Sequence, residues 1–195
     1  MAHTLIYLHG FHSSPGSLKA RQMGAYLQAQ HPELHYQVPT LPDLPLPAWQ
    51  AVSRCVEAAQ AQGTVGVLGS SMGGFWATRV AEQYGLPAVV INPAVRPDRL
   101  MSSHFLGDQC NPHTGVQYHL GTEQVDELAA FCCAELTHPE RLWLLQQQGD
   151  ELLDYRQALA LYADCRVTLE PGGSHAFEGF ERYCPAIVEF LALPR

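Results

Sequence analysis

The chain has 195 residues, 47% of them hydrophobic, and a formal net charge of -8 from 11 basic and 19 acidic side chains. This composition can fill one sizeable core, and apolar segments recur from Leu5 to Leu193 without a long polar linker, so we predict a single domain over residues 1–195. Nucleic acid and anionic membrane surfaces are not expected partners, because the chain is acidic and its only lysine is Lys19.

The lengths and positions of the apolar segments also predict the cellular location of the protein. The sequence does not open with a basic segment followed by a long apolar one, as a signal peptide would. No apolar stretch approaches the ~18 to 20 residues that a membrane-spanning helix needs. We therefore expect a cytoplasmic protein, and the sequence leaves its oligomeric state open.

Short apolar strands alternate with amphipathic helices along the chain. This order predicts an α/β fold, in which a mostly parallel sheet of about six strands carries helices on both faces. Several strands are apolar at consecutive positions, as strands buried on both faces require. In chain order we predict strand 4–8, helix 17–30, strand 35–38, helix 47–62, strand 65–68, helix 72–84, strand 88–91, helix 123–135, strand 142–146, helix 155–162, strand 166–169 and helix 180–193.

One segment, residues 93–138, separates two strands by far more than a single helix requires. It combines a stretch that we interpret as irregular, residues 107–112, with the helix after Gly121. Insertions of this size in a compact domain often form a lid or a wall of a binding site. We expect Phe105, Tyr118 and Leu120 to provide walls of a substrate pocket, with His104, His113 and His119 as further possible contacts.

The most specific motif is G-x-S-x-G at residues 69–73, between the third strand and the third helix. A sharp turn from strand to helix exposes such a serine above the sheet and strains its backbone, and glycines on either side relieve the crowding. Only Ser71 has glycine both two residues before and two after, at Gly69 and Gly73. We therefore predict Ser71 as a nucleophile and Ser70 as a polar neighbour.

An oxyanion hole is expected beside this serine. The first strand runs into His9-Gly10-Phe11, where a backbone N–H can point toward a substrate carbonyl. We predict the N–H groups of Phe11 and Met72 as the two donors, because backbone donors are oriented before charge develops on the oxygen. His9 and His12 could instead bind a metal, but no third ligand is tied to them by spacing. We prefer His9 as a residue that orders the loop, with a possible contact to substrate.

A serine hydroxyl needs a base, and the base needs an orienting acid. A glycine-rich loop after the last strand carries His175, our predicted base. Asp150 follows the preceding strand and a glycine, and it fits the acid in the chain order Ser, Asp, His. Glu151 is a rival that should point away if Asp150 points inward. Asp154 is better explained as the cap of the helix that begins near Tyr155.

With Ser71, Asp150 and His175 in this order, the whole chain resembles the α/β-hydrolase superfamily, and more narrowly it is similar to the small bacterial YqiA-like esterases. The segments that carry the likeness are 7–11 with 13–15, 69–74, 92–95, 149–155 and 173–175. The resemblance implies a compact hydrolase that cleaves short acyl esters without a metal or an organic cofactor. It implies little about the physiological substrate.

Three functions remain compatible with these residues. The first is hydrolysis of short-chain carboxylic esters through an acyl-enzyme, with a small-molecule ester as the partner. The second keeps the same triad for a thioester or a carbon–carbon bond, which the catalytic residues cannot distinguish. The third is a non-catalytic binding protein on a hydrolase scaffold, which we disfavour because every position that the chemistry needs is filled.

Overall fold

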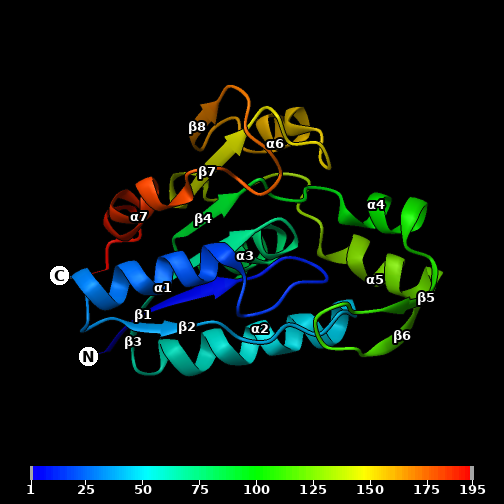
Figure 1. The fold of residues 1–195 in the computed structure, drawn as a ribbon, viewed down its shortest axis with the longest axis horizontal. Helices are drawn as coiled ribbons and strands as arrows, with labels where there is room; N and C mark the ends of the chain where they lie inside the picture. The colour runs from blue at the N-terminus through cyan, green and yellow to red at the C-terminus, as the bar shows by residue number, and fades with distance from the viewer. Residues whose placement is uncertain (1, 194–195) are drawn as a thin grey trace.

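Six parallel strands form the central sheet of the computed structural model, which describes residues 2–193, so that residues 1 and 194–195 of the predicted domain lie outside it (Figure 1). Every pair of neighbouring strands in this sheet is parallel, in the order β2-β1-β3-β4-β7-β8. The predicted fold class is confirmed. The strands are β1 (Ala2–Leu8), β2 (His35–Gln37), β3 (Gly63–Ser70), β4 (Ala88–Ile91), β7 (Leu142–Gln147) and β8 (Arg166–Glu170).

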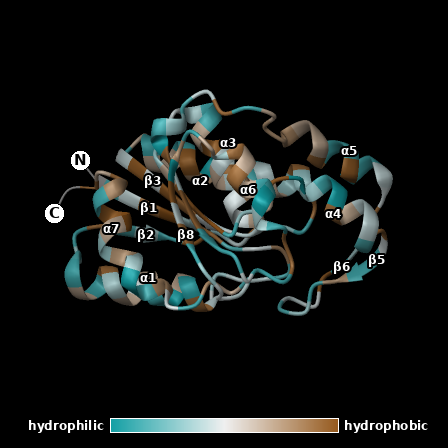
Figure 2. Ribbon diagram, turned by 90° about the horizontal axis from the view of Figure 1, so that it is seen from above, coloured by the Kyte–Doolittle hydropathy of each residue, from teal (hydrophilic) through white to brown (hydrophobic). Residues whose placement is uncertain are grey.

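Helices cover both faces of the sheet, which explains the continuous apolar runs in its central strands. In β1, Leu5 and Tyr7 belong to the core on one face, whereas Ile6 and Leu8 belong to the core on the other. Figure 2 shows the hydrophobic strands enclosed between the two helical layers. The first face is covered by α1 (Leu18–Gln30) and α7 (Cys184–Phe190), which follows the short helix η2 (Phe180–Tyr183); the second is covered by α2 (Pro45–Gln60), α3 (Met72–Tyr84) and α6 (Tyr155–Leu161).

The insertion between β4 and β7 lies at the end of the molecule away from both termini (Figure 1). It contains α4 (Pro97–His104), β5 (Gly107–Cys110), β6 (Gln117–Leu120), α5 (Thr122–Phe131) and η1 (Pro139–Arg141). The interpretation of residues 107–112 as irregular was wrong, because β5 and β6 pair as an antiparallel hairpin. These strands are short and mostly polar, so they lack the apolar run that signals a strand. The side chain of Asn111 shapes the turn by accepting from the N–H groups of His113 and Thr114.

Helix α4 was not predicted, and β1 and β3 each begin two residues before the predicted strand, whereas most other boundaries agree with the sequence to within a few residues. The helix predicted over 123–135 ends at Phe131, and the one predicted over 180–193 divides into η2 and α7. Within residues 2–193, no helix is both long enough and apolar enough to cross a membrane.

Candidate active site

Ser71 occupies the turn between β3 and α3 with φ 56° and ψ -120°, a conformation that side chains other than glycine rarely adopt. Both neighbouring glycines are sterically required. A Cβ on Gly69 would lie 2.1 Å from the carbonyl oxygen of Gly73, and one on Gly73 would lie 1.9 Å from that of Leu8. The crowding expected from the motif is therefore present, and it holds Ser71 at the carboxyl edge of the sheet.

The structure brings Ser71, His175 and Asp150 together from the ends of three strands. The Nε2 atom of His175 lies 3.0 Å from Oγ of Ser71. On the other side of the ring, Nδ1 lies 2.8 Å and 3.0 Å from the two carboxylate oxygens of Asp150. With a proton on Nδ1, the imidazole donates to Asp150 and can accept the serine proton at Nε2. This arrangement can generate a serine nucleophile.

Asp150 is held so that its carboxylate faces the imidazole. Its side chain is fully buried, and Oδ1 also accepts from the N–H groups of Leu152 and Leu153, at 3.0 Å and 2.9 Å. These donors stabilise the negative charge and prevent the carboxylate from rotating away. The two rival carboxylates have other partners: Glu151 accepts from the backbone N–H of His175, and Asp154 caps α6 through the N–H of Arg156, as predicted.

Two residues that sequence reasoning missed hold the loop that carries His175. Buried Asn92, at the end of β4, donates through Nδ2 to the carbonyl oxygens of Ser174 and His175, at 2.9 Å and 3.2 Å. Gln147, at the end of β7, accepts through Oε1 from the N–H groups of Ser174 and Glu178. A polar residue directly after a fully buried strand was the available signal for both, because carboxyl ends of parallel strands meet at one edge.

The predicted oxyanion donors lie beside the serine. Among residues 2–193, no acceptor takes the backbone N–H of Phe11 or of Met72, so both remain available for a substrate oxygen. Gly10 lies directly against the serine, since a Cβ added there would be 3.4 Å from Cβ of Ser71. The loop that carries Phe11 therefore passes within contact distance of Ser71.

His9 orders this loop through both of its ring nitrogens. Its side chain is buried, Nδ1 lies 2.9 Å from the carbonyl oxygen of Gly10, and Nε2 accepts from the N–H of Leu41 at 3.1 Å. Only a neutral imidazole can donate at one nitrogen and accept at the other. Burial lowers the pKa of His9 below its ordinary value, which favours this neutral form.

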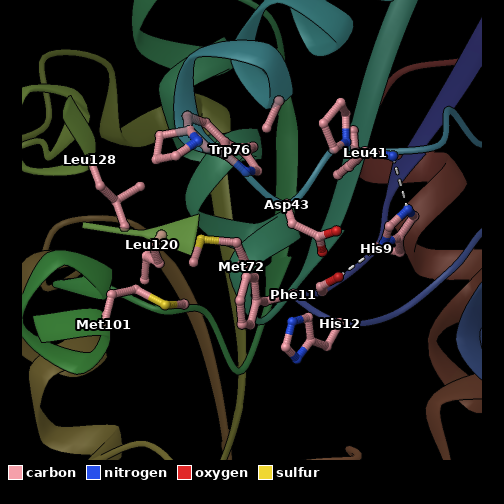
Figure 3. Close-up of a pocket in the computed structure, with 14 residues that line it drawn as sticks. His9, Phe11, His12, Leu41, Asp43, Met72, Trp76, Met101, Leu120 and Leu128 are labelled. Atoms are coloured by element: carbon pink, nitrogen blue, oxygen red, sulfur yellow. Dashed lines mark hydrogen bonds between the residues drawn. The ribbon is translucent and has the colours of Figure 1, made fainter. Parts of the chain in front are cut away.

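A largely apolar cavity opens beside Phe11 and Met72 (Figure 3). Leu41, Trp76, Met101, Leu120 and Leu128 form much of its wall, and His9, His12 and Asp43 contribute polar groups. Leu120, a predicted wall residue, lines it. Met101 and Leu128 also come from the insertion, on the helices α4 and α5 that flank the hairpin.

Phe105 and Tyr118, the other two predicted wall residues, contact the loop after β1 instead of lining the cavity. The ring of Phe105 packs edge-on against that of Phe11, with the ring centres 5.3 Å apart. The hydroxyl of Tyr118 lies 2.7 Å from Nε2 of His12, whose ring stacks on Phe11 at 4.0 Å. Through these contacts the insertion supports the loop that carries Phe11, one of the two predicted oxyanion donors. Direct contact of Phe105 or Tyr118 with substrate stays a prediction.

The described part of the chain contains no group of three or more His, Cys, Asp or Glu side chains that could hold a metal ion. His9 and His12, the pair considered from the sequence, are bonded to Leu41, Gly10 and Tyr118 instead.

Solved structures share this fold at low sequence identity. Est1E from Butyrivibrio proteoclasticus matches with a TM-score of 0.74 and 14% identity, covering 97% of this chain and 87% of that one. Alpha/beta hydrolase domain-containing protein 10 from mouse matches with a TM-score of 0.73 and 16% identity, covering 96% and 88%. Together with the parallel sheet, these matches define an α/β-hydrolase fold.

The sequence also assigns the chain to a protein family. It matches the Uncharacterised protein family (UPF0227) over residues 4–192, and the chain belongs to that family. A curated relative, the UPF0227 protein of Serratia proteamaculans (strain 568), is 26% identical over 198 residues, covering 97% of this chain and 99% of its own length. The resemblance drawn from the sequence to an α/β-hydrolase family is confirmed.

Proposed function

We propose that the protein is a serine hydrolase that cleaves short-chain carboxylic esters, with Ser71, His175 and Asp150 as its catalytic triad. The observation that carries the proposal is the imidazole of His175, which bridges the Ser71 hydroxyl and the buried Asp150 carboxylate. The fold shared with Est1E and the mouse protein supports it. The strained backbone of Ser71 fits the same role.

In the proposed mechanism, Oγ of Ser71 attacks the ester carbonyl carbon while Nε2 of His175 takes the hydroxyl proton. The carbonyl oxygen becomes negatively charged and is held by the N–H groups of Phe11 and Met72. When the bond to the leaving alcohol breaks, the proton on Nε2 passes to the alcohol oxygen. Water then attacks the acyl-enzyme with the help of His175, which releases the acid and restores Ser71.

The cavity beside Phe11 and Met72 favours a substrate with a small apolar acyl group. It adjoins both proposed oxyanion donors, and its wall is built mostly from aliphatic, aromatic and thioether side chains. An acyl chain bound there would replace contact with water by contact with these side chains, which is favourable for apolar groups alone.

Ser71→Ala tests the proposal. The variant should lose roughly 10⁴–10⁶ in turnover of p-nitrophenyl butyrate, on the scale of other triad deletions. A fluorophosphonate probe should label the wild-type protein at Ser71, as located by peptide mapping, and should not label the variant. Ser70→Ala is the matched control and should keep the labelling. Wild-type turnover by Ser71→Ala, or absence of labelling in the wild type, would contradict the assignment.

A panel of substrates that share one acyl group tests whether the protein prefers esters or thioesters. Butyryl esters and butyryl thioesters pass through the same acyl-enzyme, so their relative kcat/KM values measure the preference for the leaving group alone. A thioester preferred by more than about tenfold would replace ester hydrolysis with thioester hydrolysis as the function. Hydrolysis of neither, together with absence of labelling, would indicate a binding protein.

A further inference from the structure

Two cavities lie beside the loop that follows β1, and their charged side chains differ in sign: Asp43 lines one and Lys19 the other. The apolar cavity described above adjoins Phe11 and Met72. A second cleft is lined by Ser71 and His175 themselves, together with Ser13, Lys19 and Ala176. Gly10 and Phe11 line both, so the two cavities meet at the loop that follows β1.

The path of the proton decides which part of a substrate each cavity would hold. In acyl transfer the histidine gives its proton to the leaving group, so the leaving oxygen must lie within hydrogen-bond distance of Nε2 of His175. His175 lines the second cleft and does not line the apolar cavity. The leaving alcohol therefore belongs in the second cleft, and the acyl chain belongs in the apolar cavity.

The second cleft contains a cation, Lys19. Its ammonium group donates to the carbonyl oxygen of Ala176 at 2.6 Å, and Ala176 directly follows His175. Within residues 2–193, no carboxylate oxygen lies within the 4.0 Å that defines an ion pair with this nitrogen. An ammonium group has three N–H bonds, so two remain for other acceptors.

The surroundings of Lys19 keep it charged, and none of the ion pairs among residues 2–193 includes it. Burial lowers the pKa of Lys19 to about 8, while the charge of Asp150 acts in the opposite direction. A group with that pKa is still about nine-tenths protonated at pH 7. Asp150 cannot reach the cleft because its side chain is fully buried, and Glu151 does not line it. Half-burying a cation without an anionic partner costs free energy in the free protein. An anionic ligand that forms a charge-assisted hydrogen bond with the cation would therefore bind favourably.

We propose that Lys19 binds an anionic group, a carboxylate or a phosphate, on the leaving alcohol of the substrate. This inference rests on the proposed function. Because Ser71, His175 and Lys19 line one cleft, the anion and the leaving oxygen would belong to the same small alcohol. Esters of short hydroxy acids or of hydroxyalkyl phosphates carry both groups. Lys19 is the only lysine in an acidic chain, so long-range attraction by the whole surface does not account for such a preference.

The test uses four butyryl esters that differ only in the leaving alcohol: butyryl glycolate, butyryloxyethyl phosphate, ethyl butyrate and butyrylcholine. The quantity compared is the ratio of kcat/KM for an anionic ester to that for ethyl butyrate. Taking this ratio within one protein sample removes differences in the folded fraction between variants. A charge-assisted hydrogen bond predicts a ratio of about 10 to 100 for the wild type, with butyrylcholine below ethyl butyrate. The ratio should decrease with added salt.

Three variants separate recognition from structural support. In Lys19→Gln the amide can still donate to the carbonyl of Ala176 but carries no charge, so the ratio should fall to about one. Lys19→Arg restores the charge and should restore most of the ratio. Arg21→Gln is the matched control: it removes a positive charge from the same helix at an exposed position outside the cleft, and the ratio should stay at the wild-type value.

The outcomes distinguish this proposal from the proposed function. A wild-type ratio near one, with ethyl butyrate hydrolysed and Ser71 labelled by fluorophosphonate, overturns the role of Lys19 and leaves the hydrolase assignment intact. An equal ratio in the wild type and Lys19→Gln has the same meaning. A protein that hydrolyses none of the four esters and is not labelled overturns both. The larger of the two anionic ratios identifies the carboxylate or the phosphate as the preferred group.

Discussion

The side-chain oxygen of Asn92 accepts a hydrogen bond from the backbone N–H of Gln147 at 2.9 Å, which links the ends of two neighbouring strands, β4 and β7. The amide nitrogen of Asn92 donates in the opposite direction, to the loop that carries His175. The residue also adopts a φ of 39°, which Asn and Asp tolerate better than other side chains do. One buried amide therefore connects the sheet to the proposed base.

Asn92→Asp keeps the backbone conformation and the acceptor but removes the donor to Ser174 and His175. The free energy of unfolding should fall by about 1–3 kcal/mol, because the half-buried carbonyl oxygens of Ser174 and His175 lose this donor and face a carboxylate oxygen instead. In the folded enzyme kcat should fall roughly 10²-fold with little change in KM, as a displaced base predicts. Fluorophosphonate titration of active sites normalises the rate. Wild-type kcat per titrated site would show that this amide does not position His175.

Asp150→Asn changes the identity of the orienting group without changing its size. The NH₂ group of the asparagine cannot accept a hydrogen bond from the N–H at Nδ1 of His175. The imidazole therefore favours the tautomer with its proton on Nε2, which cannot take the serine proton. On the scale of serine proteases, kcat should fall about 10⁴-fold. Glu151→Gln is the control, because its amide oxygen can still accept from the backbone N–H of His175. If Glu151→Gln were the variant with the larger loss, Glu151 would replace Asp150 as the acid.

Gly73→Ala places a methyl group where the carbonyl oxygen of Leu8 already lies, 1.9 Å from the new Cβ. Backbone cannot move aside as a flexible side chain can, so the free energy of unfolding should fall by about 3 kcal/mol or more. Urea denaturation measures the loss. Gly16→Ala is the control, since its Cβ would meet only the Ser14 hydroxyl, at 3.6 Å. Equal stability of both variants would mean that the turn before α3 is less crowded than described.

His9 makes the stability of the protein depend on pH. Burial holds its pKa below the ordinary value, so the unfolded chain binds this proton more readily than the folded protein does. The ordinary pKa of a histidine in an unfolded chain is about 6.5. As pH falls below this value, protonation of His9 in the unfolded chain lowers the free energy of unfolding. His9→Gln retains an acceptor for the N–H of Leu41 and does not titrate. The free energy of unfolding, measured from pH 7 to pH 5, should therefore decrease less in the variant. The same slope in both proteins would contradict this.

The sequence predicts the sheet well because its signals are local. Runs such as Val65–Leu68 and Ala88–Ile91 are apolar at consecutive positions, and only a strand buried on both faces needs that pattern. The glycines around Ser71 identify the strained turn by sterics alone. Chain order then leaves few choices for the residues that meet Ser71 at the carboxyl edge.

What the sequence could not predict depends on contacts between distant segments. The hairpin of β5 and β6 is stabilised by pairing across its strands and by the bond from Tyr118 to His12, and no run of residues in it is apolar. Asn92 and Gln147 stand where buried strands end, but their hydrogen bonds to the loop of His175 depend on how the fold brings these segments together. Lys19 carries no motif at all. Its proposed role follows only from the structure, in which α1 brings the ammonium group beside the carbonyl oxygen of Ala176.

The cavity wall contributed by Met101, Leu120 and Leu128 comes from a stretch of chain that holds none of the three proposed triad residues. Unlike Phe105 and Tyr118, which contact the loop after β1, these three side chains line the cavity, so changes in their size should leave Ser71, His175 and Asp150 in place. In the proposed hydrolase, the preference for acyl-chain length can therefore be altered separately from bond cleavage. These three positions are where redesign of selectivity should begin.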